Sequence, residues 1–124
     1  MTQAPHLQSG EAAEHLACEH LQQQGLQLIQ RQYRRKTGEI DLIMRDQQTL
    51  VFVEVRFRAK STFGGALASI NPAKQKKLWR TAMLYLQRYK QPPACRFDVV
   101  TITQSASGQL IFQQWIPNAF QGDL

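Results

Sequence analysis

The sequence of 124 residues is within the usual size range of one domain, and its hydrophobic content of 43% is sufficient to form one core. No run of about 18 apolar residues occurs, which excludes a membrane-spanning helix, and the N-terminus lacks the pattern of a signal peptide. We therefore expect a cytoplasmic protein that makes no membrane contact. Cys18 and Cys95 have no CxxC spacing, so we expect free thiols and no disulfide framework.

The charge of the chain is basic. Fifteen Lys and Arg residues against nine Asp and Glu residues give a formal net charge of +6. This balance favours polyanionic partners such as nucleic acid. A balance of this size also occurs in ordinary soluble domains, so charge alone does not identify the partner.

The first third of the chain predicts a helix and a strand. Residues 1–8 show no periodicity and are expected to be a loose terminus, whereas residues 9–124 are expected to form a single domain. Ser9 can cap a helix that begins one or two residues later and ends near Gly25, which suits a left-handed C-terminal cap. A strand is expected over residues 26–33.

Two apolar, β-branched runs follow and predict a hairpin. They cover residues 38–44 and 50–57 and are joined by a polar stretch at 45–49. The next segment, residues 59–70, contains two glycines and shows no period, so we expect a flexible loop or an irregular crossover.

The last third of the chain predicts a long helix and two strands. Asn71 and Pro72 suit the cap and first position of the helix, and Pro92 is expected to end it. Strands are expected over residues 95–103 and 109–116. The order α, β, β, β, α, β, β favours an α/β fold with a mixed central sheet flanked by helices.

The predicted hairpin carries two acids inside apolar strands. Alternation places Ile40 and Leu42 on one face of the first strand and Asp41 on the other. In the second strand, Glu54 shares a face with Phe52. Both faces are therefore expected to be buried, and a buried acid needs a partner. A solvated edge hairpin is the alternative interpretation. In a later strand, Asp98 is expected to pair with Arg96 or another buried base.

The register of the hairpin decides whether the two acids meet. If Gln47 and Gln48 form a two-residue loop, or if the loop has four residues, Asp41 lies opposite Glu54. Directly opposed side chains point to the same face, with Cβ atoms about 4.5 to 5.5 Å apart. A three-residue loop would place the two acids on opposite faces. Two facing acids need a divalent cation, a cationic neighbour such as Arg56, or a raised pKa on one of them.

These segments together resemble a known family. They are GEIDLI at 38–43, FVEVR at 52–56, FG at 63–64, and KQ at 74–75, which opens the long helix. The combination resembles the bacterial YraN-type family of predicted nucleases, which is similar to archaeal Holliday-junction resolvases. The spacing of Asp41 and Glu54 also resembles the D-x(n)-(D/E)-x-K signature of the restriction-endonuclease-like superfamily. The resemblance implies an αβββαβ nuclease core.

The resemblance also implies an activity and a set of site residues. It implies a metal-dependent endonuclease that hydrolyses phosphodiester bonds in branched or structured DNA. Asp41 and Glu54 would bind Mg²⁺ or Mn²⁺, helped by the backbone carbonyl of Val55. Glu11 would be a third ligand or an acceptor behind the ligands, although the helix dipole alone favours an acid there. Gln75 would point at the mouth of the site, a helix-start hydrogen bond being the alternative.

Arg56 departs from the superfamily signature, which most often has Lys at this position. Arginine stays charged in proteins, so Arg56 cannot act as a general base and can only attract negative charge. A metal would have to activate the water, with Arg56 stabilising the added charge. The departure keeps open a non-catalytic nucleic-acid-binding module on the same fold. A structural protein with an acidic protein partner is a third alternative.

Basic residues flank the two acids in the sequence. The residues predicted to contact nucleic acid are Arg31, Arg34, Arg35, Lys36, Arg58, Lys60 and Lys74. Phosphate contacts give affinity that falls with salt and carry no base specificity. Lys76, Lys77 and Arg80 on the long helix are more simply explained as a solvated face. Archaeal resolvases act as dimers, which suggests a homodimer here.

Overall fold

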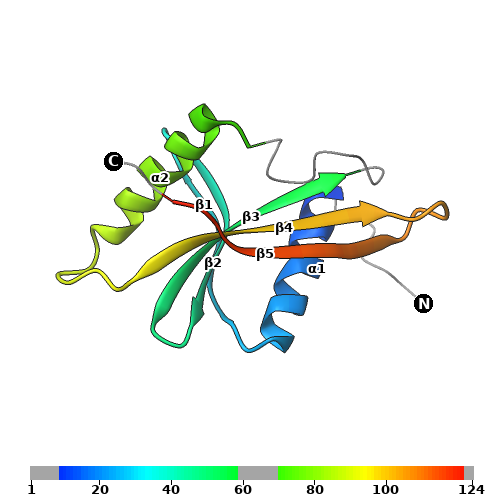
Figure 1. Cartoon of the computed structure of the whole chain (residues 1–124), viewed down its shortest axis with the longest axis horizontal. Coiled ribbons are helices and arrows are strands. Elements are labelled where there is room, and N and C mark those ends of the chain that lie inside the picture. Colours follow the sequence, from blue (N-terminus) through cyan, green and yellow to red (C-terminus); the bar gives the residue numbers. More distant parts are fainter. Residues whose placement is uncertain (1–8, 59–69, 122–124) are drawn as a thin grey trace.

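The computed structural model describes residues 9–58 and 70–121 of the chain. The expected loose terminus at 1–8 and nearly all of the expected loop at 59–70 lie outside these ranges. In chain order (Figure 1) the elements are α1 (Ser9–Gln23), β1 (Gln27–Arg35), β2 (Gly38–Asp46), β3 (Thr49–Arg58), α2 (Pro72–Leu86), β4 (Cys95–Gln104) and β5 (Leu110–Phe120). The order predicted from the sequence is confirmed.

The strands form one mixed sheet in the order β1-β2-β3-β4-β5. β3 pairs with β4 in parallel, and the other neighbours are antiparallel. A parallel pair needs a crossover, and α2 lies within the connection from β3 to β4. This is the predicted α/β fold with a restriction-endonuclease-like αβββαβ core. No helix within the described ranges is long and apolar enough to cross a membrane.

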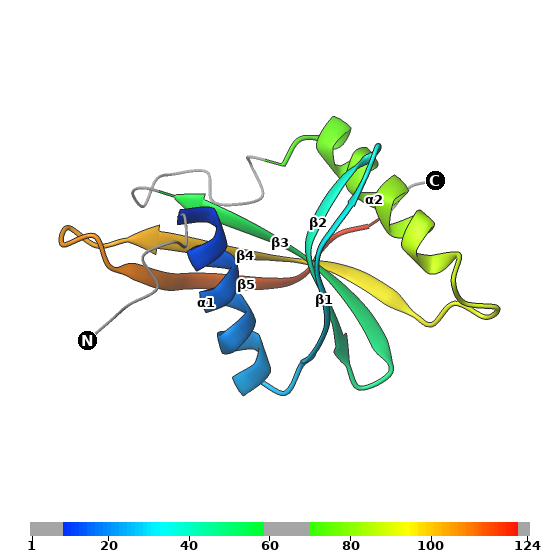
Figure 2. The same cartoon turned by 180° about the vertical axis from the view of Figure 1, so that it is seen from behind.

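The two helices cover opposite faces of the sheet, as Figures 1 and 2 show from the two sides. The α1 face packs Ala17 and Leu21 against a cluster that includes Val53. The α2 face packs Tyr85 against a cluster that includes Phe52. Burial of each large apolar side chain contributes about 1.5 to 3 kcal/mol, which explains why the central strands are apolar on both faces.

The predicted helix caps at Gly25 and Asn71 are confirmed, whereas Ser9, which was expected to precede the first helix as its cap, is the first residue of α1. Gly25 has a φ of 103°, and the Leu26 N–H donates to the Leu21 carbonyl at 3.0 Å, so α1 ends in a Schellman motif. At the start of α2, the Asn71 Oδ1 accepts the Lys74 N–H at 2.8 Å. These caps satisfy backbone groups that would otherwise lack helical partners.

The second helix ends earlier than the sequence predicts. Pro92 was expected to end it, but α2 ends at Leu86. The Tyr89 N–H then donates to the Leu86 carbonyl at 3.0 Å, a tighter turn that leaves the helical path. A proline shows only where a helix must have ended. In this chain, hydrogen bonds of the turn after Leu86 end the helix before Pro92.

The hairpin register matches the prediction from an even loop. Gln47 and Gln48 form a two-residue loop, and the pairs run from Asp46 opposite Thr49 to Leu42 opposite Val53. Gln47 has a φ of 58°, and a positive φ is what two-residue hairpin loops require. The same register puts Asp41 and Glu54 one position beyond the last backbone pair.

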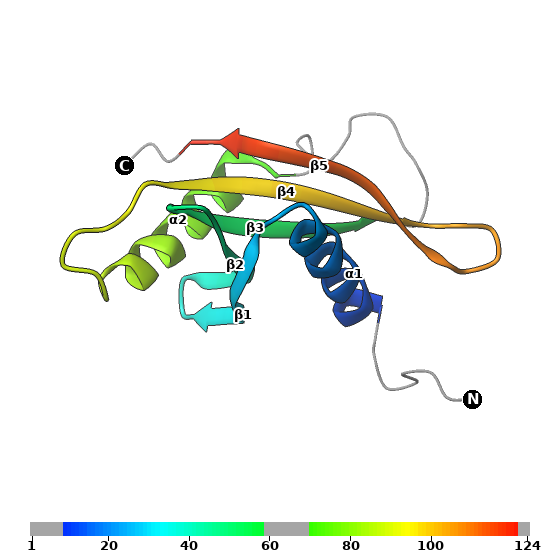
Figure 3. The same cartoon turned by 90° about the horizontal axis from the view of Figure 1, so that it is seen from below.

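Beyond that last pair the two strands part. The first half of β2 continues beside β1, and the second half of β3 continues beside β4. Figure 1 shows the β1–β2 end rising towards α2 while β3 runs to the right with β4, and Figure 3 shows the same separation from below. Both acids therefore lie where the backbone pairing of β2 and β3 ends.

One expectation about the faces of β2 is wrong for the same reason. Ile40 and Leu42 were expected to share a face, but Ile40 packs in the α2-side cluster and Leu42 in the α1-side cluster. Strict alternation holds for a regular strand, whereas β2 bends as it leaves β3. Gln32, which lies on β1 at the level of Asp41, has a φ of 52°, so β1 is irregular at the same place.

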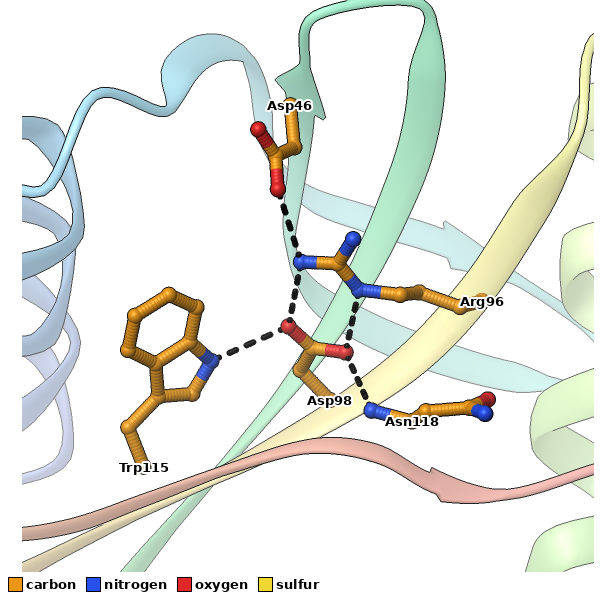
Figure 4. A network of polar contacts seen from close by, with 5 residues as sticks. All are labelled: Asp46, Arg96, Asp98, Trp115 and Asn118. Carbon is orange, nitrogen blue, oxygen red and sulfur yellow. Dashed lines mark hydrogen bonds and ion pairs between the residues drawn. The ribbon is translucent and has the colours of Figure 1, made fainter.

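A buried polar network fixes β4 and β5 (Figure 4). Asp98 is 0% exposed and accepts two bonds from the Arg96 guanidinium, at 3.0 and 3.2 Å. The Trp115 Nε1–H and the Asn118 N–H donate to the same carboxylate at 3.0 and 2.9 Å. Arg96 also pairs with Asp46 at 3.2 Å. The expected pairing of Asp98 with Arg96 is confirmed.

The last strand continues further than the expected end at residue 116. It passes Pro117 and reaches Phe120, with a register shift opposite Asp98. Asn118 has a φ of 51°, as an irregular residue in a bulge often has. Because β5 is an edge strand, Pro117, which has no N–H to donate, is tolerated there.

Candidate metal and nucleic-acid site

Asp41 is held against the neighbouring strand at the point where β2 and β3 part. Its Oδ2 accepts the backbone N–H of Val55 at 2.8 Å. The bond keeps the carboxylate beside β3 after backbone pairing has ended. The backbone of β3 therefore fixes the position of this acid.

Three carboxylates converge there. Glu14 of α1, Glu39 of β2 and Asp41 each offer an oxygen, and these oxygens lie within 4.8 Å of one another. All three side chains are half-buried, and the Gln32 amide donates to Glu14 at 3.2 Å. We call Glu14, Glu39 and Asp41 the acidic triad.

The acidic triad borders a cavity of about 350 Å³. Its lining comes from α1 and the β1–β2 hairpin, and comprises Gly10, Glu11, Glu14, Gln32, Arg34, Glu39 and Asp41. The cavity has the size of a small ligand pocket, for which about 300 to 1,000 Å³ is usual.

The surroundings shift the pKa of two of these acids. Burial raises the pKa of Asp41 to about 8, the charges of Glu54, Glu14 and Glu39 act in the same direction, and the Val55 N–H opposes them. Burial also raises the pKa of Glu14, to which the charge of Glu39 adds. A cation among these oxygens would relieve both burial and repulsion. The pKa shifts are typical of functional sites.

Glu54 has a different environment. It is 4% exposed, and its Oε2 lies 3.2 Å from the Arg56 Nη1 and 3.3 Å from the Lys74 Nζ. Two cations from β3 and α2 therefore balance its charge. Glu54 is nevertheless close enough for its charge to raise the pKa of Asp41. The acids lie side by side, with Asp41 turned towards α1 and Glu54 towards α2.

The resemblance also implied site roles for Glu11, Gln75 and Val55. Glu11 is exposed and lines the cavity, but it does not belong to the acidic triad. The Gln75 amide donates to the Ile70 carbonyl at 3.0 Å, which is the helix-start alternative. At Val55, the backbone N–H donates to Asp41, and the role of its carbonyl as a metal ligand stays a prediction.

The predicted basic residues on β1 border the same region. Arg31 lines a neighbouring cavity with Glu11 and Glu14. Arg34 pairs with Glu39 at 3.3 Å, and Arg35 stacks on the Tyr33 ring at 4.2 Å. Lys36 is exposed. The side chain of Arg58, and all of Lys60, lie outside what the structure describes.

Sequence reasoning missed two members of the acidic triad. Glu14 lies one helical turn after Glu11, and Glu39 lies two residues before Asp41 in the same strand. Both spacings bring side chains to one side of their element, so periodicity could have found them. The sequence does not show that α1 lies against the β1–β2 hairpin, which is what brings the three acids together.

The donor set fits a hard divalent cation. All the converging ligands are carboxylate oxygens, which Mg²⁺ and Mn²⁺ prefer, and the triad has no thiolate or imidazole that would favour softer metals. Burial and three neighbouring carboxylates raise the pKa of Asp41, and a divalent cation would offset both effects.

Comparison with known proteins identifies relatives across most of the chain. The model of "Uncharacterised protein family UPF0102" matches residues 13–102. A UPF0102 protein of Nitrosococcus oceani is 50% identical over 98% of this chain and 98% of its own length. Another, from Janthinobacterium sp., is 51% identical over 91% of this chain and 87% of its own length. A third, from Herminiimonas arsenicoxydans, is 52% identical over 90% and 86%. The chain therefore belongs to the UPF0102 family.

Proposed function

We propose that this chain is a metal-dependent endonuclease that hydrolyses phosphodiester bonds in branched or structured DNA, in the cytoplasm. The observation that supports this most is the acidic triad, which borders a cavity between α1 and the β1–β2 hairpin and has Arg34 paired with Glu39. An all-oxygen cluster next to basic groups suits a divalent ion and a phosphate. The resemblance to YraN-type predicted nucleases and archaeal resolvases points to the same chemistry.

In this proposal the protein positions charge around the scissile phosphate. Asp41, with Glu14, Glu39 or Glu54, would hold Mg²⁺ or Mn²⁺. The bound ion would lower the pKa of a water molecule and polarise the phosphoryl group. Arg56 and Lys74 would stabilise the charge that develops on the phosphate oxygens.

Arg56 limits the roles available at the motif position. Its guanidinium keeps its proton, so it serves by charge and by its contact with Glu54 at 3.2 Å. The same contact supports a second candidate, a module that binds structured nucleic acid without cutting it. In that case the Arg56–Glu54 pair would be a fixed part of the binding surface.

A cleavage assay separates the two candidates. Purified protein is incubated with four-way junction, flap and linear DNA, with Mn²⁺ or with EDTA, beside Asp41→Asn and Glu54→Gln. Glu19→Gln is a matched control, because Glu19 is an exposed acid on α1 that pairs with His15. The nuclease predicts Mn²⁺-dependent products that disappear in the first two variants and persist in the control. Binding without products in every variant would favour the module instead.

A homodimer is part of the proposal only by analogy with archaeal resolvases. Light scattering of the purified chain would test it: a mass twice that of the 124-residue chain supports a dimer, and a mass equal to that of one chain refutes it.

A further inference from the structure

A second cavity lies directly beside the acidic triad. It has a volume of about 330 Å³ and lies between the start of β2, at Gly38 and Glu39, and the first turns of α2, at Lys74 and Lys77. Glu39 also lines the cavity of the acidic triad, so the two cavities share a wall. A chain-like ligand could occupy both.

The second cavity has a positive side. Lys74 and Lys77 line it, and the first turn of α2 contains no acidic residue. The amino end of a helix adds positive potential of its own. The one acid of its lining, Glu39, is engaged by Arg34 at 3.3 Å. Among the described residues, Lys77 forms no ion pair, so its ammonium group remains available to an anion.

The walls of the cavity are tied together. The Thr37 and Thr81 hydroxyl groups form a 2.7 Å hydrogen bond between the β1–β2 turn and α2. Thr81 is 0% exposed, and its hydroxyl also donates to the Lys77 carbonyl at 2.9 Å. A Cβ on Gly38 would lie 3.4 Å from the Thr81 Oγ1, so turn and helix are closely packed. The spacing across the cavity is therefore set by the fold.

We propose that this cavity binds a backbone phosphate of the nucleic-acid strand, adjacent to the phosphodiester held at the acidic triad. Lys77 is the main contact, and Lys74 lines the same cavity while its ammonium group lies 3.3 Å from Glu54. The inference rests on the proposed function for the identity of the ligand. Lysine ammonium groups bind phosphate as point charges, and such contacts set the register of a strand without reading its bases.

The test compares two adjacent lysines. Lys76 is exposed on the same helix but does not line the cavity, so Lys76→Gln removes the same charge elsewhere. The affinity of each variant for labelled flap DNA is measured by fluorescence anisotropy at several salt concentrations, with Ca²⁺ in place of Mn²⁺. Single phosphates of the strand are then replaced, one position at a time, by uncharged methylphosphonate.

Each phosphate contact contributes about 0.7 to 0.9 to the slope with which log affinity falls against log salt concentration. Loss of one contact in Lys77→Gln should therefore weaken binding roughly five- to eightfold at 0.1 M salt. At one position in the strand, a methylphosphonate should weaken the binding of the DNA to the parent protein, to Lys76→Gln and to Lys77→Arg. The same methylphosphonate should not change the binding of the DNA to Lys77→Gln. An unchanged response in Lys77→Gln would overturn the inference, as would equal effects of Lys76→Gln and Lys77→Gln.

The two proposals fail in different ways. Cleavage that does not depend on Lys77, together with an unchanged methylphosphonate profile, refutes the phosphate site and leaves the nuclease. A Lys77-dependent profile without cleavage refutes the nuclease and leaves the phosphate site. Absence of binding to any nucleic acid refutes both.

Discussion

Asp41 is the residue at which folding and the proposed activity conflict most. It is a half-buried acid beside three other carboxylates, and burial raises its pKa to about 8. The folded chain therefore favours the protonated form, whereas the unfolded chain loses the proton near the ordinary value of 3.8. Keeping an acid in this position costs stability at neutral pH, which is common where a side chain is retained for function.

The stability of the protein without added metal should fall as the pH rises between about 4 and about 8. The contribution of Asp41 is fully present below its unfolded pKa and lost as the pH passes its folded pKa, at about 1.4 kcal/mol for each pKa unit of difference. Asp41→Asn should remove the part of this dependence that comes from Asp41, leave the part that comes from Glu14, and be the more stable protein at pH 9. Urea unfolding at pH 4 and pH 9, in EDTA, measures both proteins. A variant less stable than the parent at pH 9 would contradict this.

At the scale of elements, the site depends on how the β1–β2 turn meets α2. Gly38 has a φ of 148°, which side chains other than glycine rarely adopt, and its backbone lies close to Thr81. Gly38→Ala should cost about 1 to 3 kcal/mol of unfolding free energy through backbone strain. Gly10→Ala is the control, since no atom would contact the new Cβ and the residue is helical. Equal stability of the Gly38 variant and the parent in urea would refute the claim that this turn is constrained.

The network around Asp98 joins β4 to β5 and should matter more for stability than for the site. Asp98→Ala leaves Arg96 without its buried partner and should cost about 3 to 5 kcal/mol. Asp46 pairs with the same arginine, but its side chain is 37% exposed, so Asp46→Asn should cost less than about 1 kcal/mol. Urea unfolding of both variants tests this contrast. Similar losses in the two would mean that the network does not act through burial.

At the scale of the whole molecule, the sequence predicted the parts that depend on local patterns. The order of the elements, the caps at Gly25 and Asn71 and the hairpin register all follow from periodicity and turn chemistry. The register then placed Asp41 and Glu54 together at the end of their pairing. The apolar residues on both faces of these strands predicted that the two acids would have buried surroundings. The structure explains this pattern, since a helix covers each face of the sheet.

The sequence could not predict what depends on contacts between distant elements. The bend of β2 at Asp41 turned the two acids towards different helices, so Asp41 meets Glu14 and Glu54 meets Lys74. The two-residue alternation of a strand assumes regular geometry, so it cannot predict such a bend. The sequence alone does not distinguish Glu11 from Glu14, and only the resemblance selects Glu11. The sequence predicts a solvated face for Lys77 because the cavity that Lys77 lines is formed only when the start of β2 lies beside α2.

If the acidic triad binds a divalent metal, the folded protein should bind Mn²⁺, which electron paramagnetic resonance can follow. We expect at least one Mn²⁺ per chain, with binding lost in Asp41→Asn and weakened in Glu14→Gln. Glu11→Gln should have a smaller effect, and the exposed Glu19→Gln should have none. No Mn²⁺ binding at millimolar concentration, or equal binding by the protein and Asp41→Asn, would contradict the account.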